Sequence, residues 1–255
     1  MKRLDMRTIL SAWTLIIFFT TGCAKAQRQQ PELENVRTYY NQGTAYYNKG
    51  QYDKAISDFN KAIELNPKSD DAYYNRGLAY YNKGQYDTAI SDFNKAIELN
   101  PKSDDAYINR GLTYYNKGQF DRTISDYTKA IELNPAYVDA YTNRGYVYYN
   151  KGQFDRAISD YTKAIELNPA YVDAYTNRGY VYYKKAQFDQ AISDFNKAIE
   201  LNPGYVDAYH CRGAAYYYKK EYDKAWDDVE KVQALGGQVH PEILKRLREA
   251  SGRGR

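Results

Sequence analysis

Apolar residues recur along most of this chain with the spacing of amphipathic α-helices. In residues 70–103, Tyr73, Gly77 and Tyr80 are four and three positions apart. After a break at Gly84, the same spacing continues through Tyr86, Ala89, Ile90, Phe93, Ala96 and Ile97. Side chains three and four residues apart lie on one face of a helix. The segment therefore predicts two helices, each with one apolar face, joined by a turn.

The ends of these two helices also follow from the sequence. Asp70 and Asp71 precede the first apolar positions, where carboxylates favour the positive end of the helix dipole. Gly84 suits the left-handed residue that ends many helices. Pro101 disfavours helical geometry in the residue before it, so the second helix should end before Pro101.

This two-helix unit is repeated. Its last proline recurs every 34 residues, each time at the end of the sequence Ile-Glu-Leu-Asn-Pro, at Pro67, Pro101, Pro135, Pro169 and Pro203. We predict six copies, at 36–69, 70–103, 104–137, 138–171, 172–205 and 206–239. Helices of about a dozen residues are marginal alone, so each hairpin must bury its apolar face against its neighbours.

The repeated pattern resembles the tetratricopeptide repeat (TPR) family, which has an aromatic residue, Leu-Gly, Tyr, Ala, Phe and Pro within 34 residues. The second copy matches it at Tyr73, Gly77, Tyr80, Ala89, Phe93, Ala96 and Pro101. The resemblance implies an all-α, right-handed superhelical solenoid of six helix-turn-helix hairpins. Residues 240–255 add an apolar face after Pro241, from which we expect a C-terminal capping helix with a basic tail.

A glycine recurs at the centre of each first helix. Because it has no side chain, we expect the partner helix to approach closely, and within 138–171 we expect the two helices to meet at Gly145 and Ala157. The residue before this glycine departs from the family's Leu, since five copies have arginine: Arg76, Arg110, Arg144, Arg178 and Arg212. We expect these to pair with aspartates of the second helices, at Asp92, Asp126, Asp160, Asp194 and Asp228. An arginine ladder that binds a ligand is the alternative.

Charge and motifs argue against several functions. Residues 36–239 contain 26 basic and 27 acidic residues, so the repeats lack the basic excess expected of a nucleic-acid-binding protein. No phosphate-binding loop, nucleophile elbow or zinc-protease motif is present. His210 and Cys211 are too few for a zinc site. We therefore predict no enzyme activity, no cofactor, no metal and no nucleic-acid partner.

Tyrosine, with 31 of the 255 residues, provides the candidate binding surface. One column follows the core tyrosine of each first helix by one residue, which turns it about 100° from the core: Tyr47, Tyr81, Tyr115, Tyr149, Tyr183 and Tyr217. The family resemblance implies that first helices line a concave groove for partners. We expect Tyr40, Tyr74, Tyr146 and Tyr180 to join the column there, with Asn75, Asn109, Asn143 and Asn177 nearby. General packing or solubility is the alternative role.

The first residues predict export. Lys2, Arg3 and Arg7 precede an apolar run over residues 9–19, as in a signal peptide, which we assign to residues 1–22. Gly22-Cys23 resembles the cleavage site of bacterial lipoproteins, which implies lipidation of Cys23 and attachment to a membrane, with residues 23–35 as a linker. Cleavage after Ala26, giving a soluble exported protein, and a retained anchor remain alternatives.

These features predict an exported, lipid-anchored scaffold that binds a protein segment in a groove lined by Tyr and Asn, facing the periplasm or the cell exterior. In layout it resembles lipoproteins of envelope and pilus assembly that combine a lipidation site with TPR arrays. The main alternative is binding of glycan, either peptidoglycan or an exported polysaccharide, because tyrosine faces flanked by amides suit sugar rings. A further alternative is an accessory subunit of an enzyme. The sequence does not identify the partner.

Overall fold

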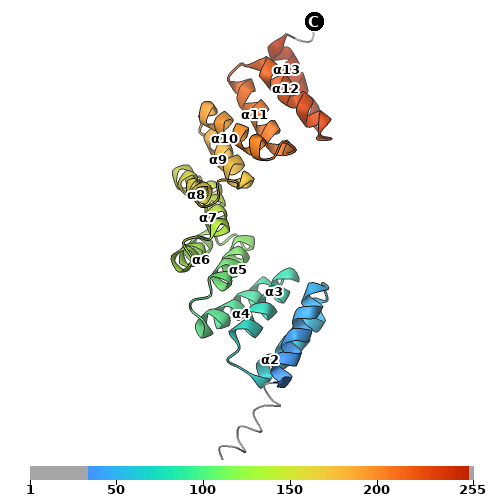
Figure 1. Cartoon of the computed structure of the whole chain (residues 1–255), viewed down its shortest axis with the longest axis vertical. Helices are drawn as coiled ribbons and strands as arrows, with labels where there is room; N and C mark the ends of the chain where they lie inside the picture. Colours follow the sequence, from blue (N-terminus) through green and yellow to red (C-terminus); the bar gives the residue numbers. More distant parts are fainter. Residues whose placement is uncertain (1–33, 253–255) are drawn as a thin grey trace, which may run out of the picture. The chain divides into compact units, whose positions relative to one another are not determined.

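A computed structural model describes residues 34–252 of the protein, which are helical throughout apart from short turns (Figure 1). The first described helix covers residues 34–48. It is followed by α2 (Tyr52–Leu65), α3 (Asp70–Asn82), α4 (Tyr86–Leu99), α5 (Asp104–Asn116), α6 (Phe120–Leu133), α7 (Val138–Asn150), α8 (Phe154–Leu167), α9 (Val172–Lys184), α10 (Phe188–Leu201), α11 (Val206–Tyr218), α12 (Tyr222–Ala234) and α13 (Pro241–Ser251).

The chain divides into two compact units, with the division between Thr113 and Tyr114. In the first unit, α3 packs against both α2 and α4. In the second unit, each helix from α6 to α13 packs against the next, and α9 also contacts α7 and α11. Residues 34–252 contain no strand. The predicted all-α fold, in which consecutive helix pairs pack in series and a C-terminal helix follows them, is confirmed.

Local signals fix the ends of the helices. The Ser69 hydroxyl accepts a hydrogen bond from the Ala72 amide at 3.3 Å, which caps α3 at its N-terminus. Gly84 follows α3 with a φ of 72°, in the left-handed region that glycine adopts without steric cost. α4 ends at Leu99, and Asn100 before Pro101 is no longer helical.

The core contains many alanines and, in each of the first five hairpins, one fully buried aromatic ring. The largest fully buried rings are Phe59, Phe93, Tyr127, Tyr161 and Phe195. A Cβ added at Gly145 would lie only 3.0 Å from the Cε1 atom of Tyr161. The glycine thus makes room for the large ring one helical turn beyond Ala157 on α8, and the expected contact of Gly145 with Ala157 stays a prediction.

α13 closes the C-terminal end of the second unit. Leu247 is buried against Ala225 and Val229 of α12. The Trp226 Nε1 atom donates a hydrogen bond to the Ser251 hydroxyl at 3.1 Å, which attaches the end of α13 to α12. The last hairpin thus has an apolar cover on its outer side, as expected of a terminal repeat.

The predicted signal peptide, Cys23 and most of the linker lie outside the described residues, as do the last three residues of the basic tail. Within residues 34–252, every helix is too short or too polar to cross a bilayer.

Candidate partner-binding surface

The six predicted column tyrosines lie near the C-terminal ends of the first helices and are half-buried. Each ring packs against the aromatic residue that begins the following helix, with ring centroids 5.6–5.9 Å apart. The pairs are Tyr47–Tyr52, Tyr81–Tyr86, Tyr115–Phe120, Tyr149–Phe154, Tyr183–Phe188 and Tyr217–Tyr222. These tyrosines therefore take part in packing the hairpins as well as reaching the surface.

In the second unit, tyrosines from successive first helices touch one another. Tyr146 lies 5.9 Å from Tyr115 and 6.5 Å from Tyr149 between ring centroids. Tyr180 repeats this arrangement at 5.6 Å from Tyr149 and 6.1 Å from Tyr183. We call the continuous set the tyrosine stripe: Tyr115, Tyr146, Tyr149, Tyr180, Tyr183, Tyr217 and Tyr218.

Tyr218 is a member of the stripe that the sequence analysis missed. Its ring lies 5.8 Å from Tyr183 and stacks on Phe188 at 5.6 Å with an angle of 7° between the planes. Tyr218 is 58% exposed and Tyr146 is 46% exposed, so the stripe presents aromatic surface to solvent. The signal in the sequence is the run of three tyrosines at 216–218, where the preceding copies end in Tyr-Tyr-Lys or Tyr-Tyr-Asn.

The predicted Tyr40 and Tyr74 do not belong to the stripe. They lie in the first unit, where their rings pack on the buried Phe59 and Phe93 at 6.0 and 5.9 Å. The Asn75 side-chain amide donates to the Tyr40 hydroxyl at 3.0 Å, and that of Asn109 donates to the Tyr74 hydroxyl at 2.9 Å. These contacts join neighbouring repeats, so the four residues have a structural role.

The other two predicted asparagines differ. Asn143 and Asn177 have no such acceptor, because the positions 35 residues before them hold Ile108 and Thr142 in place of a tyrosine. Asn143 is exposed and Asn177 is half-buried on the same helices as the stripe. A different asparagine, Asn150, donates to the hydroxyl of Tyr115 at 3.1 Å and was missed in the sequence.

The pKa values of the stripe reflect its packing. Burial is the main cause that raises the pKa of Tyr149 above its usual value, and the neighbouring Tyr180 hydroxyl adds to it. Tyr115 behaves in the same way next to Tyr146. These phenols therefore stay neutral at physiological pH, and the stripe offers uncharged rings and hydroxyl groups.

One cation lies on the stripe. The Lys184 ammonium group is 5.1 Å from the centroid of the Tyr180 ring, a cation–π contact. A hydrogen bond with Tyr180 is the main cause that raises the pKa of Lys184. The four preceding copies have asparagine at this position, so the positive charge is specific to this part of the stripe.

Four of the five predicted cross-helix arginine pairs are confirmed. Arg76, Arg144, Arg178 and Arg212 each bind both carboxylate oxygens of the aspartate 16 residues later, at 2.6–3.0 Å. A remaining nitrogen of each guanidinium reaches a side-chain oxygen on the second helix of the preceding repeat: Asn60, Thr128, Thr162 and Asn196. These four arginines use their donors to join three helices, which accounts for them without a ligand.

His210 and Cys211 have separate environments. His210 Nε2 lies 3.1 Å from the Gln238 carbonyl oxygen, so the ring holds the segment that leads into α13. Cys211 is half-buried, and burial raises the pKa of its thiol to about 11. Within residues 34–252, no three His, Cys, Asp or Glu side chains come together as a metal site would require.

Comparisons with known proteins agree with this geometry. A family profile described as TPR repeat matches residues 43–84, 112–152 and 146–186. Two profiles described as Tetratricopeptide repeat match residues 70–103 and 172–205, and residues 93–124 and 195–227. Members of this family are generally scaffolds without enzyme activity that bind protein partners. A comparison with curated protein sequences finds no match.

Several solved structures are similar. The crystal structure of YrrB, a TPR protein with an unusual peptide-binding site, is 26% identical and aligns over 74% of this chain and 96% of YrrB, with a TM-score of 0.61. The crystal structure of the MamA protein is 30% identical over 67% of this chain and 93% of MamA, with a TM-score of 0.62. A Pseudomonas aeruginosa pilF structure reaches a TM-score of 0.71 over 85% of this chain and 99% of pilF, but at 16% identity it shares the fold alone.

Proposed function

Because the chain belongs to the tetratricopeptide repeat family, we propose that it is a scaffold that binds an extended protein segment along the tyrosine stripe. The observation that carries this proposal is the unbroken contact of seven tyrosine rings over four successive first helices, α5, α7, α9 and α11. Tyr146 and Tyr218 are 46% and 58% exposed, so the stripe presents aromatic surface that a partner could cover.

The chemistry of tyrosine supports a protein ligand. A tyrosine side chain offers a large apolar face and a hydroxyl group, and it loses little conformational entropy on binding. In the stripe, neighbouring rings and Phe188 hold these side chains in place, so the surface is largely preorganised. The peptide-binding site named for YrrB is consistent with such a role in a related protein.

A triple variant tests the proposal. Tyr146, Tyr180 and Tyr218 are replaced together by serine, because they are the stripe members that lie outside the packed column. The matched control replaces Leu65 and Leu235, which are 44% and 37% exposed outside the stripe, by serine. Each mature protein is immobilised, and proteins captured from the native envelope are quantified by mass spectrometry.

The control should capture the same partner as the wild type. The triple variant should bind it about a hundredfold less tightly, because central aromatic contacts often contribute 2 kcal/mol or more each. Equal capture by the triple variant would move the binding site away from the stripe. A glycan would be favoured as the ligand if capture disappears after muramidase digestion of the envelope and if soluble glycan inhibits it.

We also propose that the protein is exported and anchored by lipid at Cys23, facing the periplasm or the cell exterior. The support is the sequence alone, in which Gly22-Cys23 follows a basic segment and a short apolar run. Two or more acyl chains hold a protein firmly on a membrane. Growth with labelled palmitate should label the wild type but not Cys23→Ser. An unlabelled wild type in the soluble fraction would instead support cleavage after Ala26, and an unlabelled protein of full length in the membrane would support a retained anchor.

A further inference from the structure

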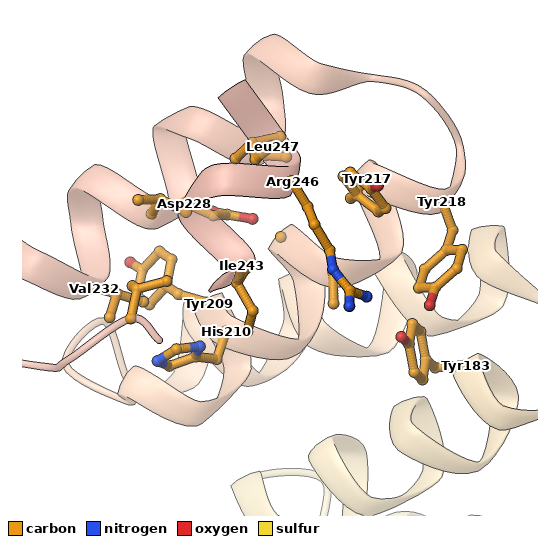
Figure 2. A pocket seen from close by; sticks show the side chains of 15 residues that line it. Tyr183, Tyr209, His210, Tyr217, Tyr218, Asp228, Val232, Ile243, Arg246 and Leu247 are labelled. Carbon is orange, nitrogen blue, oxygen red and sulfur yellow. The ribbon is translucent and has the colours of Figure 1, made fainter. Parts of the chain in front are cut away.

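The stripe ends at a pocket beneath α13. The pocket has a volume of about 200 Å³ and lies among α11, α12 and α13 (Figure 2). Its inner wall is apolar, with Val232 and Leu247 among its residues. Its outer edge includes Tyr218 and Ile243, which are 58% and 52% exposed, so it is accessible from solvent.

A small residue of α11 helps to keep the pocket open. Ala214 lines it at the position held by Tyr146 and Tyr180 in the two preceding copies. In those copies the ring fills the space between column tyrosines, as Tyr180 does between Tyr149 and Tyr183. In the last copy the Tyr218 ring lies between the column tyrosines, 5.8 Å from Tyr183 and 5.5 Å from Tyr217, and the small Ala214 leaves the adjoining pocket open.

The size and the walls fit one aromatic side chain. An apolar cavity of about 150 Å³ is large enough to bind benzene, so about 200 Å³ accommodates a single ring. The pocket is smaller than the 300–1,000 Å³ or so that is usual for a drug-sized molecule. His210 fixes the segment before α13 through its contact with Gln238, so the far wall is held in position without a ligand.

Two cations lie at or near the mouth of the pocket. In Figure 2 the Arg246 side chain extends from α13 between Ile243 and Tyr218. Arg246 contacts Glu242 through Nε at 3.3 Å, but its side chain is 67% exposed and retains donors for a ligand. Lys184 adds a second cation over Tyr180. The one acid that lines the pocket, Asp228, is buried and bound to Arg212.

We propose that this pocket takes one aromatic side chain of an acidic protein segment, whose remaining residues lie along the tyrosine stripe. The proposal rests on the proposed function and specifies the chemistry of the partner. The ring would lie in the pocket beside Ala214, and carboxylates next to it would lie near Arg246 and Lys184. The expected motif is therefore an aromatic residue flanked by Asp or Glu, because charge complementarity adds to the burial of the ring.

Synthetic peptides test the pocket directly. The first probe is a dye-labelled nonapeptide with blocked ends, in which a central Phe is flanked by Glu residues. The second probe has Ala in place of Phe, and the third has Gln in place of Glu. Binding to the protein without its first 22 residues is measured by fluorescence anisotropy. The Phe peptide should bind at least about tenfold more tightly than the Ala peptide.

Two variants of the pocket give the decisive comparison. Ala214→Tyr restores the residue of the preceding copies and should fill the space, so the advantage of Phe over Ala should disappear. Leu78→Tyr makes the same kind of change at the matching position of α3 in the first unit and should leave both affinities unchanged. Ile243→Glu changes an exposed edge of the pocket and should also weaken binding of the Phe peptide. It replaces Ala214→Tyr in the comparison if that variant folds poorly.

Charge is tested with Arg246→Gln. This variant should weaken the Glu peptide about two- to fivefold and leave the Gln peptide unchanged. Equal affinity of the wild type for the Phe and Ala peptides, or an unchanged Phe advantage in Ala214→Tyr, overturns the pocket. The proposed function survives the loss of the pocket if the Ala peptide binds the triple serine variant of the stripe more weakly than it binds the wild type. If no peptide binds, the acidic aromatic motif is wrong, and the envelope capture experiment decides on the stripe separately.

Discussion

Arg178 donates two hydrogen bonds to Asp194, from Nε at 2.8 Å and from Nη2 at 2.7 Å. The remaining nitrogen Nη1 donates to the Thr162 hydroxyl at 3.0 Å. One guanidinium thereby connects α9, α10 and α8. Burial still raises the pKa of Asp194 above its usual value, although Arg178 opposes this shift. The pair therefore fixes the arrangement of the helices, while the loss of hydration offsets much of its attraction.

The energetic balance of this pair can be measured with a double-mutant cycle. Asp194→Ala alone should cost about 3–5 kcal/mol, because it leaves a buried arginine without its partner. Replacing both residues by leucine should cost much less, since no charge remains buried. Urea unfolding of the two single variants and the double variant gives the coupling. A double variant as unstable as Asp194→Ala would show that the pair contributes net stability.

The sequence predicted the arginine pairs because both partners recur with the 34-residue period. A charged residue in every copy on a packed helix needs an opposite charge, and only one aspartate per second helix recurs beside the core aromatic position. The additional contact with Thr162 was not predicted, because the residue there varies between Asn and Thr among the copies. Periodicity thus identified what all copies share.

The candidate surface was predicted less well for the same reason. The column that includes Tyr149 recurs in all copies and proved to pack against the next helix. The stripe members outside this column occur only in the later copies: the predicted Tyr146 and Tyr180 replace leucines, and Tyr218, which was missed, replaces a polar residue. A shared pattern reports the common fold, so a surface present in one part of the array has to be sought in the differences between copies.

The close approach at Gly145 predicts a strong effect of substitution. Gly145→Leu should cost about 1–3 kcal/mol, because even a Cβ would lie 3.0 Å from the buried Tyr161 ring. Shortening the ring's side chain with Tyr161→Leu should reduce the additional cost of Gly145→Leu, since the added atoms then have space. Urea midpoints of the four proteins measure this coupling. An unchanged midpoint for Gly145→Leu would disprove the close approach.

Two turns contain a strained residue. Ala186 has a φ of 57° and Lys220 a φ of 63°, at the positions where earlier hairpins have glycine. A left-handed conformation costs a residue with a Cβ roughly 1 kcal/mol more than glycine. Ala186→Gly should therefore stabilise the protein by about that amount in urea, and Gly152→Ala, at the equivalent turn, should destabilise it similarly. Destabilisation by Ala186→Gly would mean that its methyl group makes contacts worth more than the strain.

Cys211 should be a slow thiol. Burial raises its pKa to about 11, with Asp207 as a smaller cause. At pH 8 only about one molecule in a thousand would then carry the reactive thiolate. In a Cys23→Ser protein, alkylation by iodoacetamide should be slow at pH 8 and should accelerate about tenfold per pH unit up to pH 10. Unfolding in urea should restore the rate of an ordinary cysteine. A rate in the folded protein that levels off near pH 8.5 would contradict the raised pKa.

The two kinds of tyrosine in the stripe should differ in what they contribute to stability. Tyr149 is half-buried and packs with Phe154 against a core cluster that includes Tyr161, so Tyr149→Ala should cost about 1–3 kcal/mol. Tyr146 is 46% exposed, and Tyr146→Ala should cost less than about 1 kcal/mol because nearly half of its surface already faces water. Circular dichroism and urea midpoints of both variants measure the difference. A larger loss for Tyr146 than for Tyr149 would show that the exposed ring holds neighbouring repeats together, and the serine variants of the stripe would then report on folding as well as binding. If Tyr149→Ala instead loses more stability than Tyr146→Ala, removal of Tyr146 changes the binding surface with little effect on the fold.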